Sequence, residues 1–414
     1  MFWNRSGVCA PALCVVLCGC NLVVQTISEY GGEPIPGVQL QVDDQPWVVT
    51  NAEGRASFTP PGGRYTLRVL QPTDATSASG RRYVTWDLLE IDGPPGNPVV
   101  LQVEGTFVPH RQVSLSGTAG AVTDGEIILW LEGGGVVSGG TATTLVDGTY
   151  EMEAVQWEGG DGRKATLHAL QRNGAAFPAT HYLAYGSAPV TLRDLAGTGG
   201  RIEGVDMLLR PIEEAAVHGE LAVPPALAGQ AYASLSVKLA EGWTVVGLGP
   251  VAGSFDVSVP QIPGAGGTSM SAWAVGSAQL DSEYGGQLRS VSPGASVAFD
   301  LPAPVELLEP ADGTAIGADT VFRWSPHPSR GAYDLHVQCH WTQNGEEHDV
   351  NYRELETELT ERSLPVFPGV EIPSGTSCTW DVAWREVGTG SFSVAVLDRQ
   401  SRSSVSRVRT ATFR

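Results

Sequence analysis

Every apolar stretch of this chain beyond Cys20 is short, because glycine, proline or a charged residue interrupts it. Within these stretches apolar and polar residues alternate, as where glutamines separate Val38, Leu40 and Val42. A repeat of two residues places the apolar side chains on one face of a β-strand. The 51 glycines and 28 prolines supply turns between such strands. These patterns predict an all-β chain of tandem β-sandwiches.

The length and charge of the chain narrow its function classes. A chain of 414 residues with 42% hydrophobic residues is long enough for several globular domains. The formal net charge is −20, so the chain is not expected to bind nucleic acid or an anionic lipid surface through bulk charge.

The N-terminus has the pattern of an export signal. Arg5 precedes an apolar run of about a dozen residues, Val8 to Gly19, whereas a membrane-spanning helix needs roughly 20. The run ends in Leu17-Cys18-Gly19-Cys20, which resembles the bacterial lipobox, with Cys18 where alanine or serine is more usual. The resemblance implies that residues 1–19 are a signal peptide and that the Cys20 thiol is lipidated.

The resemblance also implies a lipidated linker and a location in the cell envelope. Two or three acyl chains on Cys20 would anchor residues 20–28 as a lipidated linker in the cell envelope. Asn21 stands where an aspartate is the best-known inner-membrane retention signal, which favours the outer membrane. The alternative is an ordinary secretory signal with incidental cysteines.

Residues 29–106 form the first expected sandwich. Pro34 to Val38, Thr50 to Phe58 and Gly62 to Leu67 follow one another as a proline-rich start, a hairpin and a Gly-x-Tyr-x-Leu exit with one extra residue, Arg64. In this order they resemble the carboxypeptidase regulatory-like family, whose fold is a transthyretin-like β-sandwich. The resemblance implies no catalytic residue, because the catalytic zinc domain of those enzymes is separate.

The next two blocks, 107–212 and 213–302, resemble each other. Gly148 to Leu170 aligns without a gap on Gly253 to Val275, which places Tyr150 on Phe255 at an offset of 105 residues. We therefore expect both blocks to share one sandwich topology with these aromatic residues in equivalent core positions. A chance match between glycine-rich segments is the alternative.

Residues 303–414 resemble bacterial fibronectin type III-like domains, an Ig-like sandwich. The resemblance rests on a Pro-x-Asp-Gly start at Pro310, Phe322-x-Trp324, Tyr333-x-Leu-x-Val and a later strand in which Cys378 replaces the usual tyrosine.

Cys339 and Cys378 remain when the signal cysteines and Cys20 are set aside, and alternation places both on the apolar faces of their strands. The two strands are neighbours in the fold that the block resembles. We predict a disulfide, which an exported protein can retain; two free buried thiols are the alternative.

No motif in the chain indicates catalysis, a metal or a cofactor. His340 and His348 flank Glu346-Glu347 on an expected hairpin tip, where a solvated loop is favoured over a metal site. Asp43 and Asp44 are adjacent on a strand end and point to opposite faces, so they cannot share a substrate as glycosidase carboxylates do. The glycines from Gly247 in GLGPVAG lack dinucleotide spacing and are interpreted as turn residues.

Tryptophans are the remaining candidates for ligand contact. Trp324, Trp380 and Trp384 lie on inward faces and are expected in a core, whereas four others could be exposed and stack on sugars: Trp47, Trp86, Trp157 and Trp341. The sequence as a whole predicts a non-catalytic, lipid-anchored binding or scaffold protein whose partner is an envelope protein or a glycan. A carbohydrate-binding lipoprotein is the first alternative, and a hydrolase with an unrecognised site is the second.

Overall fold

The computed structural model describes the following residues: 21–28, 32–59, 65–72, 82–88, 99–103, 111–120, 125–138, 141–143, 148–174, 176–195, 200–239, 242–276, 283–357, 359–364, 371–386 and 402–414. Within them the fold is all-β, apart from one short 3-10 turn at Pro225–Leu227. Four separate clusters of buried apolar side chains mark four sandwich cores along the chain. The all-β prediction is confirmed.

The first sandwich has two sheets, with strand orders β4-β1-β7 and β3-β2-β5-β6. Its strands are β1 (Leu22–Ser28), β2 (Gln39–Val42), β3 (Val48–Val49), β4 (Arg55–Phe58), β5 (Leu67–Pro72), β6 (Arg82–Leu88) and β7 (Val99–Val103). The interpretation of residues 20–28 as a linker is wrong for strand β1. Leu22, Val24 and Thr26 alternate into the interior, and β1 pairs with both β4 and β7.

The second sandwich repeats this arrangement with sheets β10-β12-β8-β15 and β11-β9-β13-β14-β17. Its strands are β8 (Arg111–Gly120), β9 (Glu126–Gly133), β10 (Val136–Ser138), β11 (Thr141–Thr143), β12 (Thr149–Trp157), β13 (Arg163–Gly174), β14 (Thr180–Leu192), β15 (Arg201–Ile202), β16 (Met207–Leu208) and β17 (Arg210–Pro211).

The third sandwich has the sheet β21-β18-β24 facing the strands β20-β19-β22-β23. Its strands are β18 (Glu214–Ala222), β19 (Gln230–Lys238), β20 (Trp243–Pro250), β21 (Ser254–Pro260), β22 (Gly267–Val275), β23 (Tyr284–Val291) and β24 (Ser296–Asp300).

One hydrogen-bond pattern recurs in all three sandwiches. The first strand of each runs antiparallel to a strand that directly follows a glycine. It runs parallel to a strand near the end of the sandwich, which is β7 in the first, β15 and then β16 in the second, and β24 in the third. The carbonyls of Gly54, Gly148 and Gly253 accept bonds from the first strands, from the N–H groups of Thr26, Ala119 and Leu221. Each of these glycines has a positive φ, the left-handed region that a side chain disfavours. The three sandwiches therefore share one topology, as the sequence repeat predicts for the second and third.

Tyr150 and Phe255 occupy equivalent core positions in the second and third sandwiches. Both are buried, and each faces a glycine on the first strand, Gly117 for Tyr150 and Gly219 for Phe255. A Cβ atom on Gly219 would lie 2.4 Å from the Phe255 ring, so the ring fits only because Gly219 has no side chain. At the same place the first sandwich pairs Val24 with Ala56, which divides the volume differently.

The fourth sandwich has the sheet β25-β27-β30 and, opposite it, strands β29, β28, β31, β32 and β33, with β26 paired parallel to β33. Its strands are β25 (Leu307–Glu309), β26 (Thr314–Ile316), β27 (Val321–Trp324), β28 (Gly331–Gln343), β29 (Glu346–Thr357), β30 (Glu361–Ser363), β31 (Ser377–Glu386), β32 (Arg402–Val405) and β33 (Arg409–Phe413).

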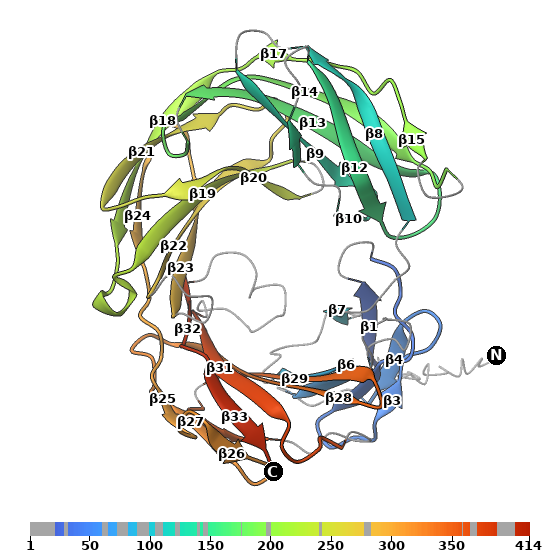
Figure 1. Ribbon diagram of the computed structural model, residues 1–414, viewed down its shortest axis with the longest axis vertical. Coiled ribbons are helices and arrows are strands. Elements are labelled where there is room, and N and C mark those ends of the chain that lie inside the picture. The colour runs from blue at the N-terminus through green and yellow to red at the C-terminus, as the bar shows by residue number, and fades with distance from the viewer. Residues whose placement is uncertain are drawn as a thin grey trace, which may run out of the picture.

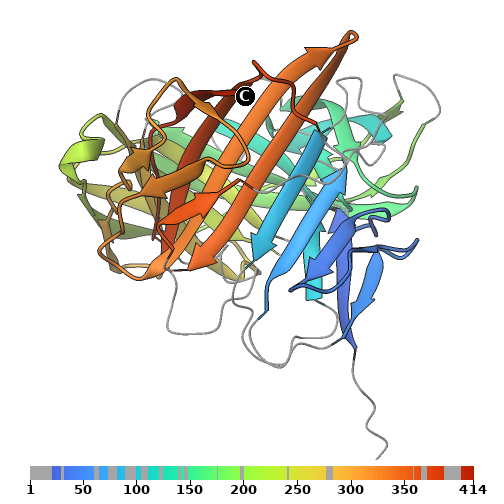
Figure 2. The ribbon, with the colours of Figure 1, turned by 90° about the horizontal axis from the view of Figure 1, so that it is seen from below.

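Strand pairing joins three of the sandwiches into one 14-stranded sheet. β23 of the third pairs with β32 of the fourth, and β29 of the fourth pairs with β6 of the first. The four sandwiches follow one another around a ring in Figure 1, and Figure 2 shows the long strands of the fourth beside the first. Strands β19, β20, β22 and β23 lie toward the centre of this ring, whereas β18, β21 and β24 lie toward its outside.

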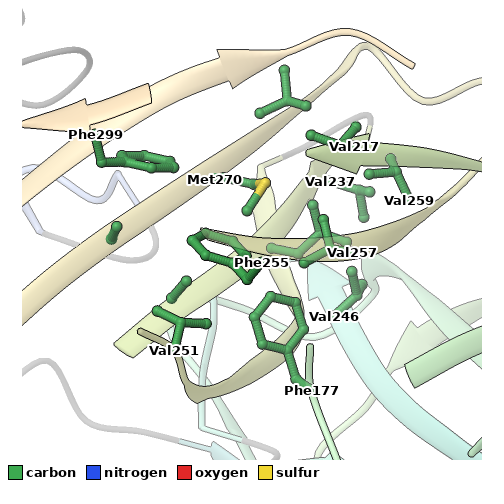
Figure 3. Close-up of a cluster of buried hydrophobic side chains, with 14 of the residues drawn as sticks. Phe177, Val217, Val237, Val246, Val251, Phe255, Val257, Val259, Met270 and Phe299 are labelled. Carbon is green, nitrogen blue, oxygen red and sulfur yellow. The ribbon is translucent and has the colours of Figure 1, made fainter. Parts of the chain in front are cut away.

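The second sandwich enters the core of the third. Phe177, which lies between β13 and β14, packs among the buried side chains of the third sandwich (Figure 3). A Cβ atom on Gly247 would lie 2.5 Å from its ring, and one on Gly249 would lie 2.3 Å from its backbone oxygen. Gly247 and Gly249 are thus strand residues of β20 that admit Phe177, and their interpretation as turn glycines is wrong.

Candidate functional site

The predicted disulfide is present in the fourth sandwich. Cys339 of β28 and Cys378 of β31 are directly opposite in the antiparallel ladder, with Cα atoms 4.1 Å apart and sulfurs bonded. Both side chains are buried, beside the core residues Trp380 and Val337. The apolar face that alternation predicts for both strands is confirmed.

Cys20, the expected site of lipidation, lies outside the described residues. The description begins at Asn21, and the first strand begins at the next residue, Leu22. In the described part of the chain, no helix has the length and apolar character to cross a bilayer.

The histidines of the β28–β29 hairpin do not converge. The turn is Asn344-Gly345, and the ladder pairs His340 with Asp349 and Trp341 with His348. Side chains alternate along a strand, so His340 and His348 lie on opposite faces and cannot bind one metal ion. His340 Nδ1 lies 2.9 Å from Asp349, while His348 stacks on Trp341. The described residues contain no group of three or more side chains placed to hold a metal ion.

A buried polar cluster, which the sequence analysis missed, lies where the third sandwich covers the second. His168 Nδ1 is 2.7 Å from the Tyr185 hydroxyl, and His168 Nε2 is 3.2 Å from a Glu132 carboxylate oxygen, outside hydrogen-bond geometry. The imidazole also stacks on Trp130. Burial lowers the pKa of His168 to about 4, so the ring is neutral near neutral pH. With its side chain only 7% exposed, the ring is closed to a substrate.

A second histidine cluster resembles a catalytic triad in composition but not in geometry. His181 Nδ1 lies 2.7 Å from a Glu214 carboxylate oxygen and 3.4 Å from the Ser258 hydroxyl. A triad needs the acid on one ring nitrogen and the nucleophile on the other, whereas both groups here meet the same nitrogen. Glu214 also accepts a bond from the Tyr182 backbone N–H, which gives the carboxylate a structural role.

The carboxylates of Asp43 and Asp44 also have a structural setting. Both lie in the turn after β2, where Asp43 has a positive φ and accepts a bond from the Thr66 N–H at 2.8 Å. The expected strand end agrees with this geometry, since the turn follows β2 directly.

Two surface hollows lie at the sandwich boundaries. One, of about 520 Å³, is bordered by Arg172, Phe177 and Leu248 between the second and third sandwiches. The other, of about 400 Å³, is bordered by Glu283, Asp312 and Arg407 between the third and fourth. Neither contains a histidine among its described lining residues.

The tryptophans divide differently from the expectation. Trp324, Trp380 and Trp384 are core residues, as predicted. Trp157 is completely buried, so its expected exposure is wrong. A β-bulge at Ala154, with φ 55, shifts the ladder between Met152 and Val155 and turns Trp157 from the outer to the inner face. Trp47 and Trp341 are half-buried, and the side chain of Trp86 lies outside the described part of the structure.

The exposed aromatic surface lies elsewhere, on the sheet β20-β19-β22-β23 of the third sandwich. It is the face of this sheet that points away from the sandwich's own core, toward the centre of the ring (Figure 1), and we call it the outer face. Trp243 is 44% exposed, and the half-buried Tyr232 and Trp273 stack with ring centroids 5.8 Å apart. Four serines lie between these two ends in cross-strand pairs, Ser236 with Ser269 and Ser234 with Ser271. We call these seven residues the serine–aromatic strip. Val245 and Leu248, both more than half exposed, flank it on the edge strand β20.

The Trp243 ring extends across this face. Trp243 pairs with Lys238, and Lys238 pairs with Gly267 on the next strand. A Cβ atom on Gly267 of β22 would be 3.8 Å from Cη2 of the indole. Strands β20 and β22 lie on either side of β19, about 10 Å apart, so the Trp243 ring extends across β19 to reach Gly267. The sequence contains a signal for this face in the alternation of A-Y-A-S-L-S-V-K and S-M-S-A-W, which places the serines with the aromatic residues.

Comparisons with known proteins do not assign the chain to a family. No protein-family model matches it, and no curated protein matches it. Among solved structures, a leucine-rich repeat protein from Bacteroides thetaiotaomicron is 9% identical with a TM-score of 0.15, over 46% of this chain and 25% of that one. A tetra-tandem repeat from the extending region of a large adhesion protein is 11% identical with a TM-score of 0.15, over 93% and 99%. The alpha-2-macroglobulin of E. coli is 10% identical with a TM-score of 0.11, over 93% and 27%.

Proposed function

We propose that this protein is an exported lipoprotein of the cell envelope that binds a partner without catalysis. In this proposal Cys20 carries the acyl chains, and the four sandwiches form a scaffold that presents the serine–aromatic strip. The carboxypeptidase regulatory-like and fibronectin type III-like resemblances of the first and last sandwiches support a scaffold of this kind. The disulfide supports an oxidising compartment, where such bonds persist.

The observation that carries the proposal is the serine–aromatic strip. Exposed large apolar side chains are usually scattered singly over the surface of a soluble protein. Where they gather on one face, they mark an interaction surface. Trp243, Val245 and Leu248 are all exposed along one strand, on the face that the third sandwich turns away from its own core.

The position of strand β1 gives the anchor a geometric consequence. Only Asn21 separates Cys20 from Leu22, the first residue of β1, and an extended residue spans about 3.5 Å. An acylated Cys20 would hold the first sandwich against the headgroups of the bilayer instead of on a flexible tether.

The proposal predicts that Cys20→Ser releases the protein from the membrane. Without the thiol no acyl chain is attached, and the hydrophobic contribution of about 0.8 kcal/mol for each buried methylene is lost. After expression in a Gram-negative host, the variant is expected in the soluble fraction and without acyl mass on its N-terminal peptide. Carbonate-washed membranes and mass spectrometry of that peptide measure both results.

Cys18→Ser is the matched control, because it alters a neighbouring cysteine that would be removed with the signal peptide. This variant is expected to stay in the membrane fraction with an acylated Cys20. Membrane retention of Cys20→Ser, or an unmodified Cys20 at the mature N-terminus, contradicts the anchor.

A further inference from the structure

We infer that the serine–aromatic strip binds a neutral, linear polysaccharide chain. The inference rests on the proposed binding function and names the class of ligand.

The spacing of the aromatic ends fits an extended chain of sugar rings. Trp243 lies beside Lys238 of β19, and the other end of the strip is Tyr232 on the same strand. The six-residue interval corresponds to about 20 Å at roughly 3.3 Å per residue. This length accommodates several sugar rings, so a polymer could stack at both ends at once.

The position of Trp243 suits the flat face of a sugar. The C–H groups on one face of a pyranose ring form an apolar surface that packs on an aromatic ring, while the hydroxyl groups point outward around the rim. The Trp243 ring reaches across β19 toward Gly267 and is 44% exposed, so it offers apolar ring surface to such a sugar.

Ser236 and Ser271, which are partly exposed, supply hydrogen-bonding groups between the aromatic ends, whereas their partners Ser269 and Ser234 are buried beside them. Each hydroxyl both donates and accepts, as the hydroxyl groups of a sugar do. Serine is a poor strand residue compared with valine or threonine, so local strand stability does not explain two adjacent pairs of it. Small hydroxyl side chains keep the surface low between the aromatic ends.

The charge of the strip favours a neutral ligand over an acidic one. The chain carries a formal net charge of −20, yet the strip and its flanks Val245 and Leu248 contain no acidic residue. Lys238, one of only two lysines in the chain, pairs with Trp243 at one end of the strip. An acidic polysaccharide would meet the negative field of the whole protein with little compensation.

The corresponding faces of the other repeated sandwiches are used differently. In the second, Ile128, Trp130 and Leu170 on the outer face are buried against the third. In the first, Gln41 and Arg68 occupy this face and bond to each other. The strip is therefore a feature of the third sandwich and not of the shared topology.

The test measures binding of cellohexaose and maltohexaose, both neutral, and of hexagalacturonate to the full mature chain, by calorimetry and tryptophan fluorescence. We expect at least one neutral glucan to bind and hexagalacturonate not to bind. Trp243→Ala and Trp273→Ala are each expected to weaken the affinity about tenfold or more, as central aromatic contacts do. Unchanged thermal unfolding of both variants assures that they fold.

Leu248→Ala and Leu208→Ala form a matched pair, because Leu208 is 74% exposed on β16, away from the strip. The first is expected to weaken binding and the second to leave it unchanged. Failure of both neutral glucans to bind overturns the inference, and so does binding that survives both tryptophan substitutions. Neither result bears on the lipid anchor, which the membrane fractionation of Cys20→Ser tests separately.

Discussion

Replacement of Cys339 and Cys378 by alanine is expected to lower the unfolding free energy of the fourth sandwich by about 4 kcal/mol. The bond joins residues 39 positions apart and so removes much of the conformational freedom of the unfolded chain between them. Urea unfolding followed by tryptophan emission measures the loss, since Trp380 and Trp384 are buried in the same core.

Reduction of the unaltered protein is the control for this prediction, because it opens the bond without removing the sulfur atoms from the core. Reduced wild-type protein is expected to unfold at a lower urea concentration than the oxidised form, and the double alanine variant is expected to be insensitive to reductant. Equal unfolding midpoints for oxidised and reduced wild-type protein would falsify the assignment.

Phe255→Ala and Gly219→Val are each expected to destabilise the third sandwich by about 3 kcal/mol or more, for opposite reasons. The first leaves a cavity in a buried position. The second places methyl groups where the Phe255 ring already lies, 2.4 Å from the new Cβ atom.

The double variant Gly219→Val with Phe255→Ala is expected to recover at least about 1 kcal/mol relative to the sum of the single effects. It recreates the combination of Val24 and Ala56 that the first sandwich uses at this place. Combining Phe255→Ala with Gly117→Ala, which faces Tyr150 in the second sandwich instead, should give an additive effect within about 0.5 kcal/mol. An additive result for the Gly219 pair contradicts the proposed exchange of volume.

Local patterns were sufficient wherever one strand alone decides the outcome. Alternation predicts that Cys339, Cys378 and Trp380 point inward, and the structure places all three in one core. The Gly-aromatic repeat likewise predicts the equivalence of Tyr150 and Phe255, because a glycine with positive φ and the side chain two residues later belong to one turn and its strand.

Local patterns failed where a single residue shifts the inward–outward alternation of a strand, or where strands distant in the sequence decide the pairing. Trp157 was expected to be exposed, but the bulge at Ala154 reverses the alternation of β12. The sequence predicts a linker over residues 20–28, whereas residues 22–28 form β1, because its pairing with β4 and β7 cannot be recognised from seven residues alone.

The sequence by itself determined the all-β class, the repeat, the absence of a recognisable catalytic motif and the inward faces of the strands that carry Cys339 and Cys378. These properties depend on residues close together in the chain. The tertiary structure alone decided which outer sheet face is free, because sandwiches more than a hundred residues apart must first be placed. Trp130 and Trp243 both lie on the outer faces of their own sandwiches, and packing between sandwiches leaves Trp130 buried and Trp243 exposed.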